Sequence, residues 1–454
     1  MNTHARFFAV CILAIASFAV VPSAFAQTPN AEQDARRHAI SADALLEKDN
    51  VAGAIKEYRA ALKLTPGYTY AHSRLGNALT DSKQYPEAIT ECRAAVALKP
   101  SYADAHTNLA RALLDSKQYA DAETECRQAL KLDPKLAAAH DVMGRLLLRQ
   151  RRIPEAVTEF QAAVRLNPSS AAAHDDLGQA LFFTDHKAAI AELTKAVKAK
   201  PAQAEYHIHL AGAYADDGQT DLAVSQMHTV FLLQPSDPAP HVALSNLLRH
   251  AGRENDAVVE ARAALALKPD DDSALQTLGN IFSALGQHGD AIAQFQKALT
   301  LRPGSASLHN DLGNAYADQG DTVRAIAEFR RAIWLAPDFT DPYNNLGSVL
   351  QGTGQLDAAI TQFKNAIRVA PLSDNAYDNL GVAYNQKRRF AEAVSAHQEA
   401  LKINPKNAHA RLNLGMDYYN AGKTDAAHAE WLAVMKMGSP AMAGQASVDL
   451  VQYP

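Results

Sequence analysis

The chain has 454 residues, enough for two or three ordinary domains, and its 48% hydrophobic content is sufficient for a sizeable core. Charged residues make up 20% of the chain and the formal net charge is −5, so there is no basic surplus to attract phosphate backbones or anionic lipids. Composition therefore argues against nucleic acid as a partner.

The N-terminal segment is predicted to be a signal peptide that is cut after Ala26. An uncharged apolar run, Phe7–Val21, ends at Pro22. The run is shorter than the roughly 20 residues that a bilayer span needs, and "AFA" before the cut is typical of a cleavage site. We therefore predict a periplasmic or secreted mature chain that starts at Gln27, with residues 27–34 as a lead-in. An uncleaved membrane anchor is the alternative.

Residues 35–441 repeat with a period of 34. Prolines recur at this step, with one step of 33, and taking each proline as position 32 gives twelve units. Position 20 is alanine in all twelve units, position 8 is always small, and position 7 is leucine in nine. A period of this length indicates a tandem array of structural repeats. The prolines are Pro66, Pro100, Pro134, Pro168, Pro201, Pro235, Pro269, Pro303, Pro337, Pro371 and Pro405.

Each unit predicts two helices. Positions 4, 7, 8 and 11 have the spacing of one apolar helix face, and positions 20, 24 and 27 have the same spacing in a second helix. Small residues at positions 8 and 20 let the two helices approach closely. Proline ends the second helix because it cannot donate to the helical hydrogen-bond ladder.

This pattern resembles the tetratricopeptide repeat family, which has a large residue at position 4, Leu-Gly at 7–8, Tyr at 11, Ala at 20, Phe at 24, Ala at 27 and Pro at 32. The stretch "YNNLGSVLQGTGQLDAAITQFKNAIRVAP", residues 343–371, shows nearly all of it. The resemblance implies an all-α, right-handed superhelical solenoid of about twelve helix–turn–helix repeats, with a concave groove that binds proteins or peptides. Residues 442–454 form a tail or a short capping helix.

The stretch "HDDLG" at residues 174–178 looks like chemistry, but position 4 is histidine in eight of the twelve units. An active site needs to occur once, whereas a frame position recurs. We predict packed, neutral rings with a pKa below the usual 6.5, with pH sensing and metal or haem binding as alternatives. Without a catalytic or phosphate-binding motif, we predict no enzyme activity, metal or cofactor. The histidines are His38, His72, His106, His140, His174, His207, His241 and His309.

Cys92 and Cys126 both occupy position 24, in consecutive second helices. Equivalent points on packed helices lie roughly 8–10 Å apart, whereas a disulfide needs Cα atoms within about 7 Å. We therefore predict free, buried thiols that take the place of phenylalanine.

In the tetratricopeptide repeat family that the chain resembles, positions 2, 5, 9, 12 and 13 of the first helix line the groove, with position 6 nearby. In repeats 2–4 these positions carry a mixed set of charges, and the lysines of the family's chaperone-tail clamp are missing, which disfavours that partner class. The charged residues are Asp81, Asp104, Asp115 and Asp141, against Arg74, Arg111, Arg145 and Arg149.

Repeats 5–7 place Phe182, Phe183, Ile208 and Val242 at groove positions that are polar elsewhere. Together they predict an apolar binding patch. The alternative is that the shortened turn, Thr184–Lys187, buries the two phenylalanines.

Repeats 8–12 are rich in asparagine at the groove positions. A carboxamide offers two donors and an acceptor, so a row of them can hold the backbone of an extended peptide. The row resembles the asparagine ladder in the repeats of O-linked N-acetylglucosamine transferase. The alternative is a family preference for asparagine at positions 6 and 9. The residues are Asn280, Asn310, Asn314, Asn344, Asn345, Asn379, Asn385, Asn413 and Asn420.

The function predicted from the sequence is an exported, non-catalytic scaffold or adaptor that binds a protein or an extended peptide in its groove. The alternative is a non-catalytic component of a glycosylation or polysaccharide synthesis and export machinery that contacts glycan.

Overall fold

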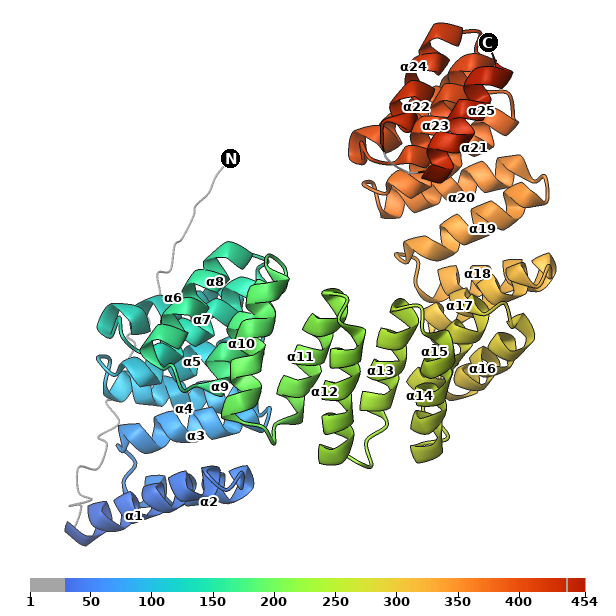
Figure 1. Ribbon diagram of the computed structural model, residues 1–454. Helices are drawn as coiled ribbons and strands as arrows, with labels where there is room; N and C mark the ends of the chain where they lie inside the picture. The colour runs from blue at the N-terminus through green and yellow to red at the C-terminus, as the bar shows by residue number, and fades with distance from the viewer. Residues whose placement is uncertain (1–28, 438–439, 454) are drawn as a thin grey trace, which may run out of the picture. The chain divides into compact units, whose positions relative to one another are not determined.

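The computed structural model describes residues 29–437 and 440–453, which form 25 helices and no strand (Figure 1). The predicted signal peptide and its cleavage site lie outside these residues. Across the described ranges, no helix combines the length and the apolar character that crossing a membrane requires.

The chain divides into two compact units between Pro201 and Ala202, directly after the shortened repeat. The first unit contains α1 (Pro29–Leu46), α2 (Val51–Leu64), α3 (Thr69–Asp81), α4 (Tyr85–Leu98), α5 (Ala103–Asp115), α6 (Tyr119–Leu132), α7 (Ala137–Arg149), α8 (Ile153–Leu166), α9 (Ala171–Leu181) and α10 (His186–Ala199).

The second unit contains α11 (Ala204–Asp216), α12 (Thr220–Leu233), α13 (Ala239–His250), α14 (Glu254–Leu267), α15 (Asp272–Ala284), α16 (His288–Leu301), α17 (Ala306–Asp318), α18 (Thr322–Leu335), α19 (Thr340–Gly352), α20 (Leu356–Val369), α21 (Asp374–Gln386), α22 (Phe390–Ile403), α23 (Ala408–Asn420), α24 (Thr424–Met435) and α25 (Pro440–Gln452).

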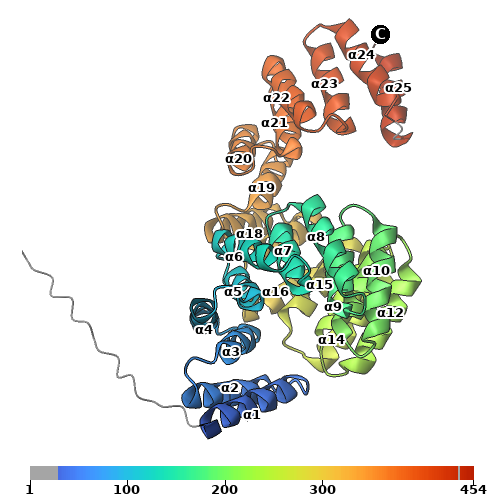
Figure 2. The same cartoon turned by 90° about the vertical axis from the view of Figure 1, so that its left-hand side faces the viewer.

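Within each unit, every repeat is a pair of helices packed against each other, such as α1 with α2 (Figure 2). The first helix of a repeat also contacts the first helix of the next, so that α3, α5, α7 and α9 follow one another in the first unit, as do α11 to α23 in the second. The predicted all-α class, a solenoid of helix–turn–helix repeats, is confirmed.

The small residue at position 8 is required by the side chain at position 24 of the same repeat. A Cβ added to Gly144 would lie 2.7 Å from Phe160, and one added to Gly347 would lie 2.5 Å from Phe363. Both phenylalanines are fully buried. Because the aromatic ring occupies the space of the missing side chain, the close helix approach predicted from the sequence is confirmed.

The turn between the two helices of a repeat uses one residue in the left-handed region, at position 15. In the second unit this residue is usually glycine, such as Gly218 with a φ of 77°, whereas in the first unit it is Lys83 with a φ of 60° or its equivalents. The shortened repeat lacks it. There Asp185 has an extended backbone, and its side chain accepts the amide of Ala188 to cap α10.

Helix α25 covers the last repeat. It contacts both α23 and α24, and Ala446 is buried in a cluster that contains Trp431, with Tyr453 packed against it. The end of the second unit therefore has its apolar surface partly covered by its own chain.

Cys92 and Cys126 are free and buried, as predicted. Burial raises the pKa of each thiol to about 12. Neither thiol is therefore a thiolate at neutral pH.

Candidate functional site

The first helices of consecutive repeats form a continuous face in each unit, which we call the first-helix face. In the first unit this face contains a cavity of about 510 Å³ that runs along α3, α5, α7 and α9. Polar and charged side chains line most of it, and Tyr70 and Tyr102 contribute the aromatic rings. Of the eight charged residues that the sequence predicted for repeats 2–4, five line this cavity: Arg74, Asp104, Arg111, Asp141 and Arg145.

One end of the cavity is held by Asp43. Its carboxylate accepts hydrogen bonds from the hydroxyls of Tyr58 and Tyr70, at 2.5 and 2.6 Å, and from Nε of Arg74 at 3.1 Å. Burial, and then the bond to Asp43, raise the pKa of Tyr70 to about 12. These side chains are hydrogen-bonded to one another, and the bonds hold this end of the cavity in one conformation.

Arg111 lies further along the same cavity, and its guanidinium is also held by neighbouring side chains. It donates to Oδ1 of Asn77 at 2.7 Å and forms an ion pair with Asp81. Arg145 lines the cavity too, but within the described part of the chain it has no carboxylate within ion-pair distance.

Asp141 on α7 and Asp176 on α9 also line this cavity, and they lie within hydrogen-bonding reach of each other. Burial raises the pKa of both carboxyls, and the charge of Asp141 raises that of Asp176 further. Arg145 opposes both shifts. The hydrogen bond between them lowers the pKa of Asp141 and raises that of Asp176, so Asp176 is the more readily protonated of the two and donates to Asp141.

In the second unit, several of the predicted groove asparagines bond to one another across repeat boundaries. The amide of Asn345, at position 6, donates to Oδ1 of Asn310, at position 5 of the preceding repeat, with a distance of 2.9 Å. Asn413 donates to Asp378 in the same way at 3.0 Å. We call such a contact between position 5 of one repeat and position 6 of the next a rung.

Two further predicted asparagines belong to a buried network that sequence reasoning missed. Asn385 donates to Oδ1 of Asp417 at 2.5 Å, and Asn420 donates to Asn385 at 3.4 Å. The other oxygen of Asp417 contacts Nδ1 of His397 at 2.5 Å, and Asp378 lies 3.2 Å from Nε2 of that ring. His397 and Asp417 are both fully buried.

His397 is therefore an imidazolium between two carboxylates. Burial alone would lower its pKa, but the two neighbouring carboxylates, Asp378 and Asp417, outweigh burial and raise the pKa to about 9. The available signal was a histidine at position 24, where neighbouring repeats have Phe295, Phe329 or Phe363.

The remaining predicted asparagines make no side-chain hydrogen bond to any described residue, and Oδ1 of Asn344 is buried without a partner. Their carboxamides are therefore not committed to rungs. These residues are Asn280, Asn314, Asn344 and Asn379.

Family models match several segments of the chain. One model, described as TPR repeat, matches residues 279–320 and 313–354. Three models described as tetratricopeptide repeat match residues 79–146, residues 339–406, and residues 41–103 with 142–184. Together the matches span 41–184 and 279–406, more than half of the chain. The chain belongs to the tetratricopeptide repeat family.

Among solved structures, the chain is similar to yeast Tom70, with 14% identity over 93% of this chain and 96% of that one, and a TM-score of 0.50. This similarity shows the tetratricopeptide fold alone. MamA is 30% identical over 36% of this chain and 96% of its own, with a TM-score of 0.33. YrrB, described as "a TPR protein with an unusual peptide-binding site", is 24% identical over 40% and 95%, also with a TM-score of 0.33. A comparison with curated proteins found no match.

One position-4 histidine of these tetratricopeptide repeats, His72, is not the neutral ring that the sequence predicted. In repeat 2, Nδ1 of His72 contacts Oε2 of Glu91 at 2.6 Å, and Nε2 contacts the carbonyl oxygen of Pro66 at 2.9 Å. Both partners are acceptors, so the ring satisfies both only when both nitrogens carry a proton. Burial lowers the pKa of His72, but these two bonds outweigh burial and raise it. For His72 the predicted lowering is therefore wrong.

The same pair of contacts recurs in other repeats of the first unit, for example His106 with Glu125 at 2.6 Å and with the carbonyl of Pro100 at 3.0 Å. His174, which opens the "HDDLG" stretch, contacts Glu192 and the carbonyl of Pro168. Each such histidine ties the two helices of its repeat together and to the end of the preceding repeat. In the described part of the chain, no three histidine, cysteine or acidic side chains are grouped as metal ligands would be.

The four residues of the predicted apolar patch are divided between the units. Phe182 and Phe183 directly follow α9 in the first unit, with ring centroids 5.8 Å apart, and Phe183 is 62% exposed. The alternative in which the shortened turn buries both rings is therefore wrong for Phe183. In the second unit Ile208 packs partly buried against the core, and Val242 is half-buried on α13. Their role in binding stays a prediction.

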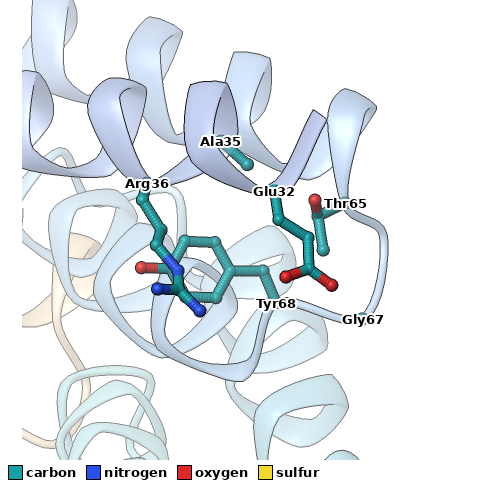
Figure 3. Close-up of a pocket in the computed structure, with 6 residues that line it drawn as sticks. All are labelled: Glu32, Ala35, Arg36, Thr65, Gly67 and Tyr68. Atoms are coloured by element: carbon teal, nitrogen blue, oxygen red, sulfur yellow. The ribbon is translucent and has the colours of Figure 1, made fainter. Parts of the chain in front are cut away.

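A second cavity, of about 340 Å³, lies at the first repeat (Figure 3). Glu32 and Arg36 extend from α1 toward the turn between α2 and α3, where Thr65 and Tyr68 lie (Figure 3). The hydroxyl of Thr65 is buried without a partner, and burial raises the pKa of Tyr68. None of the residues predicted from the sequence lies here.

Proposed function

We propose that this tetratricopeptide repeat protein is a non-catalytic scaffold or adaptor that binds a protein or an extended peptide segment on its first-helix face. The observation that carries the proposal is the cavity of about 510 Å³ along α3, α5, α7 and α9. It is built from equivalent positions of four consecutive repeats, so its polar groups recur at a regular spacing. Such a surface suits an extended ligand that contacts one repeat after another.

In the second unit, the uncommitted carboxamides mark where a peptide backbone finds partners. Asn345 donates an amide hydrogen to Asn310, so one donor of Asn345 and the acceptor of Asn310 are already used. Asn280, Asn314 and Asn379, by contrast, keep both donors and the acceptor for a ligand. We propose that this second group, rather than the whole set predicted from the sequence, contacts a ligand.

The proposal is tested by filling the cavity. Ala138, at position 2 of α7, is exposed and lines the cavity, so Ala138→Trp places a bulky ring in the binding path. Ala120, on the second helix α6, is equally exposed but does not line it, and Ala120→Trp is the matched control. Peptides are selected against the wild-type protein from a phage-displayed library of random dodecapeptides, and their affinities are measured by calorimetry.

We expect the selected peptides to bind the Ala120→Trp variant as they bind the wild type, and to lose about tenfold or more in affinity for Ala138→Trp, since a blocked contact surface removes several ligand contacts. Equal loss in both variants, or equal binding to both, would contradict the assignment of the cavity. Selection that yields no specific peptide would contradict the proposed function itself.

We also propose that the chain is exported, with a mature N-terminus at Gln27. The support is the sequence alone: a short apolar run followed by a small-residue cleavage pattern. Sequencing of the N-terminus of the protein isolated from its native cell tests this. A chain that retains Met1 and stays in the membrane fraction would favour the anchor instead.

A further inference from the structure

The rungs across repeat boundaries follow a simple rule: a donor meets an acceptor. Asn108 donates to the hydroxyl of Ser73 at 2.9 Å, and Gln276 donates to Asp311 at 2.7 Å. The rungs Asn345–Asn310 and Asn413–Asp378 obey the same rule. Position 5 and position 6 of adjacent repeats are thus placed so that their polar ends touch.

The rung between repeats 4 and 5 breaks this rule. Asp141 stands at position 5 and Asp176 at position 6, so two carboxyl groups meet where the other rungs have a donor. Ionised carboxylates only accept hydrogen bonds, and two of them in contact repel each other. Such a pair needs either a shared proton or a cation between its oxygens.

Among the described residues, no cationic side chain forms an ion pair with Asp141 or Asp176. Oδ1 of Asp141 is buried and has no hydrogen-bond partner among the described residues. Arg111 is held by Asn77 and Asp81, and Arg145 stands close enough to act through its charge but forms no ion pair. The charge of Asp175, the neighbour of Asp176 on α9, raises the pKa of Asp176 further.

The rung is also accessible from the cavity. Asp141 and Asp176 both line it, together with Ala138 and Ala172. Ala138 precedes Asp141 by three residues and Ala172 precedes Asp176 by four, so each alanine lies on the same helix face as its aspartate. Both alanines are exposed, and their short side chains leave a path to the carboxyl groups.

We propose that the Asp141–Asp176 rung binds a lysine or arginine side chain of the partner segment. This inference rests on the proposed peptide binding and names the chemistry of one contact. The ammonium or guanidinium donates to both carboxylates and takes the place of the shared proton, which passes to the solvent. Since both carboxyls have raised pKa values, binding becomes tighter as the pH rises and the proton leaves more readily.

Other rungs of this chain already contain the residue pairs that suitable control variants would create. Asp176→Asn recreates the Asp–Asn rung of Asp378 and Asn413, and the double change with Asp141→Asn recreates the Asn–Asn rung of Asn310 and Asn345. Both replacements have the shape of the original and a donor that the original lacks. We expect both variants to fold and to melt at a higher temperature than the wild type at pH 8, because the carboxylate repulsion is gone.

The test uses the mature chain and the random dodecapeptide library. We expect peptides selected by the wild type to share a lysine or arginine in one register, and their affinity to fall about tenfold or more in the double variant, as for a hydrogen bond to a charged group. Changing that residue of the peptide to glutamine should weaken binding to the wild type equally and to the double variant little. Calorimetry in buffers of different ionisation enthalpy should show release of a proton.

Two outcomes overturn the inference separately. If selected peptides bind the double variant as tightly as the wild type and are still lost in Ala138→Trp, peptide binding stands and the acidic rung does not recognise a cation. If no peptide is selected at all, the proposed function fails and the inference fails with it.

Discussion

The buried imidazolium of the second unit makes a sharp prediction for His397→Phe. Phenylalanine fits the slot, because a Cβ on Gly381 would lie 2.5 Å from His397, the same as the 2.5 Å between Gly347 and Phe363. The change therefore keeps a ring in the slot and removes the positive charge together with the Nδ1–H bond to Asp417. Asp417, fully buried, keeps its bond to Asn385 but loses its cation.

The magnitude follows from the titration of the ring. A pKa raised from 6.5 to about 9 corresponds to about 3 kcal/mol of preference for the charged form in the folded protein. Removing one partner of a buried pair costs about 3–5 kcal/mol, in the same range. Because the folded pKa is raised, this stabilisation is complete below pH 6.5 and is lost as the pH rises through about 9.

The assay must be local, because a long repeat array need not unfold in one step. Amide hydrogen exchange of α21–α24 should become about 100-fold faster or more in His397→Phe at pH 6.5, with α1–α10 unchanged. Correcting for intrinsic rates, the difference from the wild type should shrink toward pH 9.

The matched control is the double variant His397→Phe, Asp417→Ala. It reproduces the neighbourhood of Phe295 and Ala315, which occupy the same two repeat positions and are both fully buried. We expect it to recover most of the lost protection. Wild-type protection in the single variant, or a double variant no better than the single one, would refute the account of a buried ion pair.

Three smaller predictions follow from the first unit. Because the pKa of His72 is raised, its contribution to stability is complete below pH 6.5 and is lost as the pH rises above that value. After correction for intrinsic exchange rates, amide exchange in α3 and α4 should slow from pH 8 to 6, and this corrected trend should vanish in Glu91→Gln. Lys83→Gly should raise stability by about 1 kcal/mol in urea unfolding, since Lys83 has a φ of 60°, and a loss would contradict the strain. Cys92 and Cys126 should react with a thiol reagent at pH 8 only after unfolding; rapid labelling of the native protein would contradict their burial.

The frame could be predicted from the sequence because it is repeated. Periodic prolines, the small residue at position 8 and the alanine at position 20 each report the same local geometry many times, so a single misreading does not matter. Free Cys92 and Cys126 followed from that frame, since the spacing of adjacent helices alone excludes a disulfide.

The raised pKa of His72 was missed because burial alone was considered and the carboxylate partner was not. Position 23 is glutamate in seven of the eight repeats with histidine at position 4, such as Glu91 for His72, and it is Gln226 in the eighth. The repeats with Leu275 and Tyr343 at position 4 have Gln294 and Gln362 there. This correlation between two positions was visible in the sequence. It links helices that only the fold brings together, so attention to one column at a time does not reveal it.

The groove was only partly predictable for a related reason. Position alone identified the asparagines of the first-helix face, but whether an amide faces a ligand or a neighbouring repeat depends on the residue next to it in space. Asn345 meets Asn310, and Asn413 meets Asp378. Asn314 meets no such partner among the described residues.

The contact of His397 with Asp417 also constrains the order of the repeats. Repeats that share one backbone could in principle be exchanged, duplicated or paired out of register during folding. If repeat 12 followed repeat 9, Asp417 would face the ring of Phe329 and remain buried as an unpaired charge. The pair thus distinguishes the correct neighbour of repeat 12 from the ten other units and penalises shuffled arrangements. A buried ion pair that occurs once in an array of similar repeats therefore specifies which repeat precedes the last one.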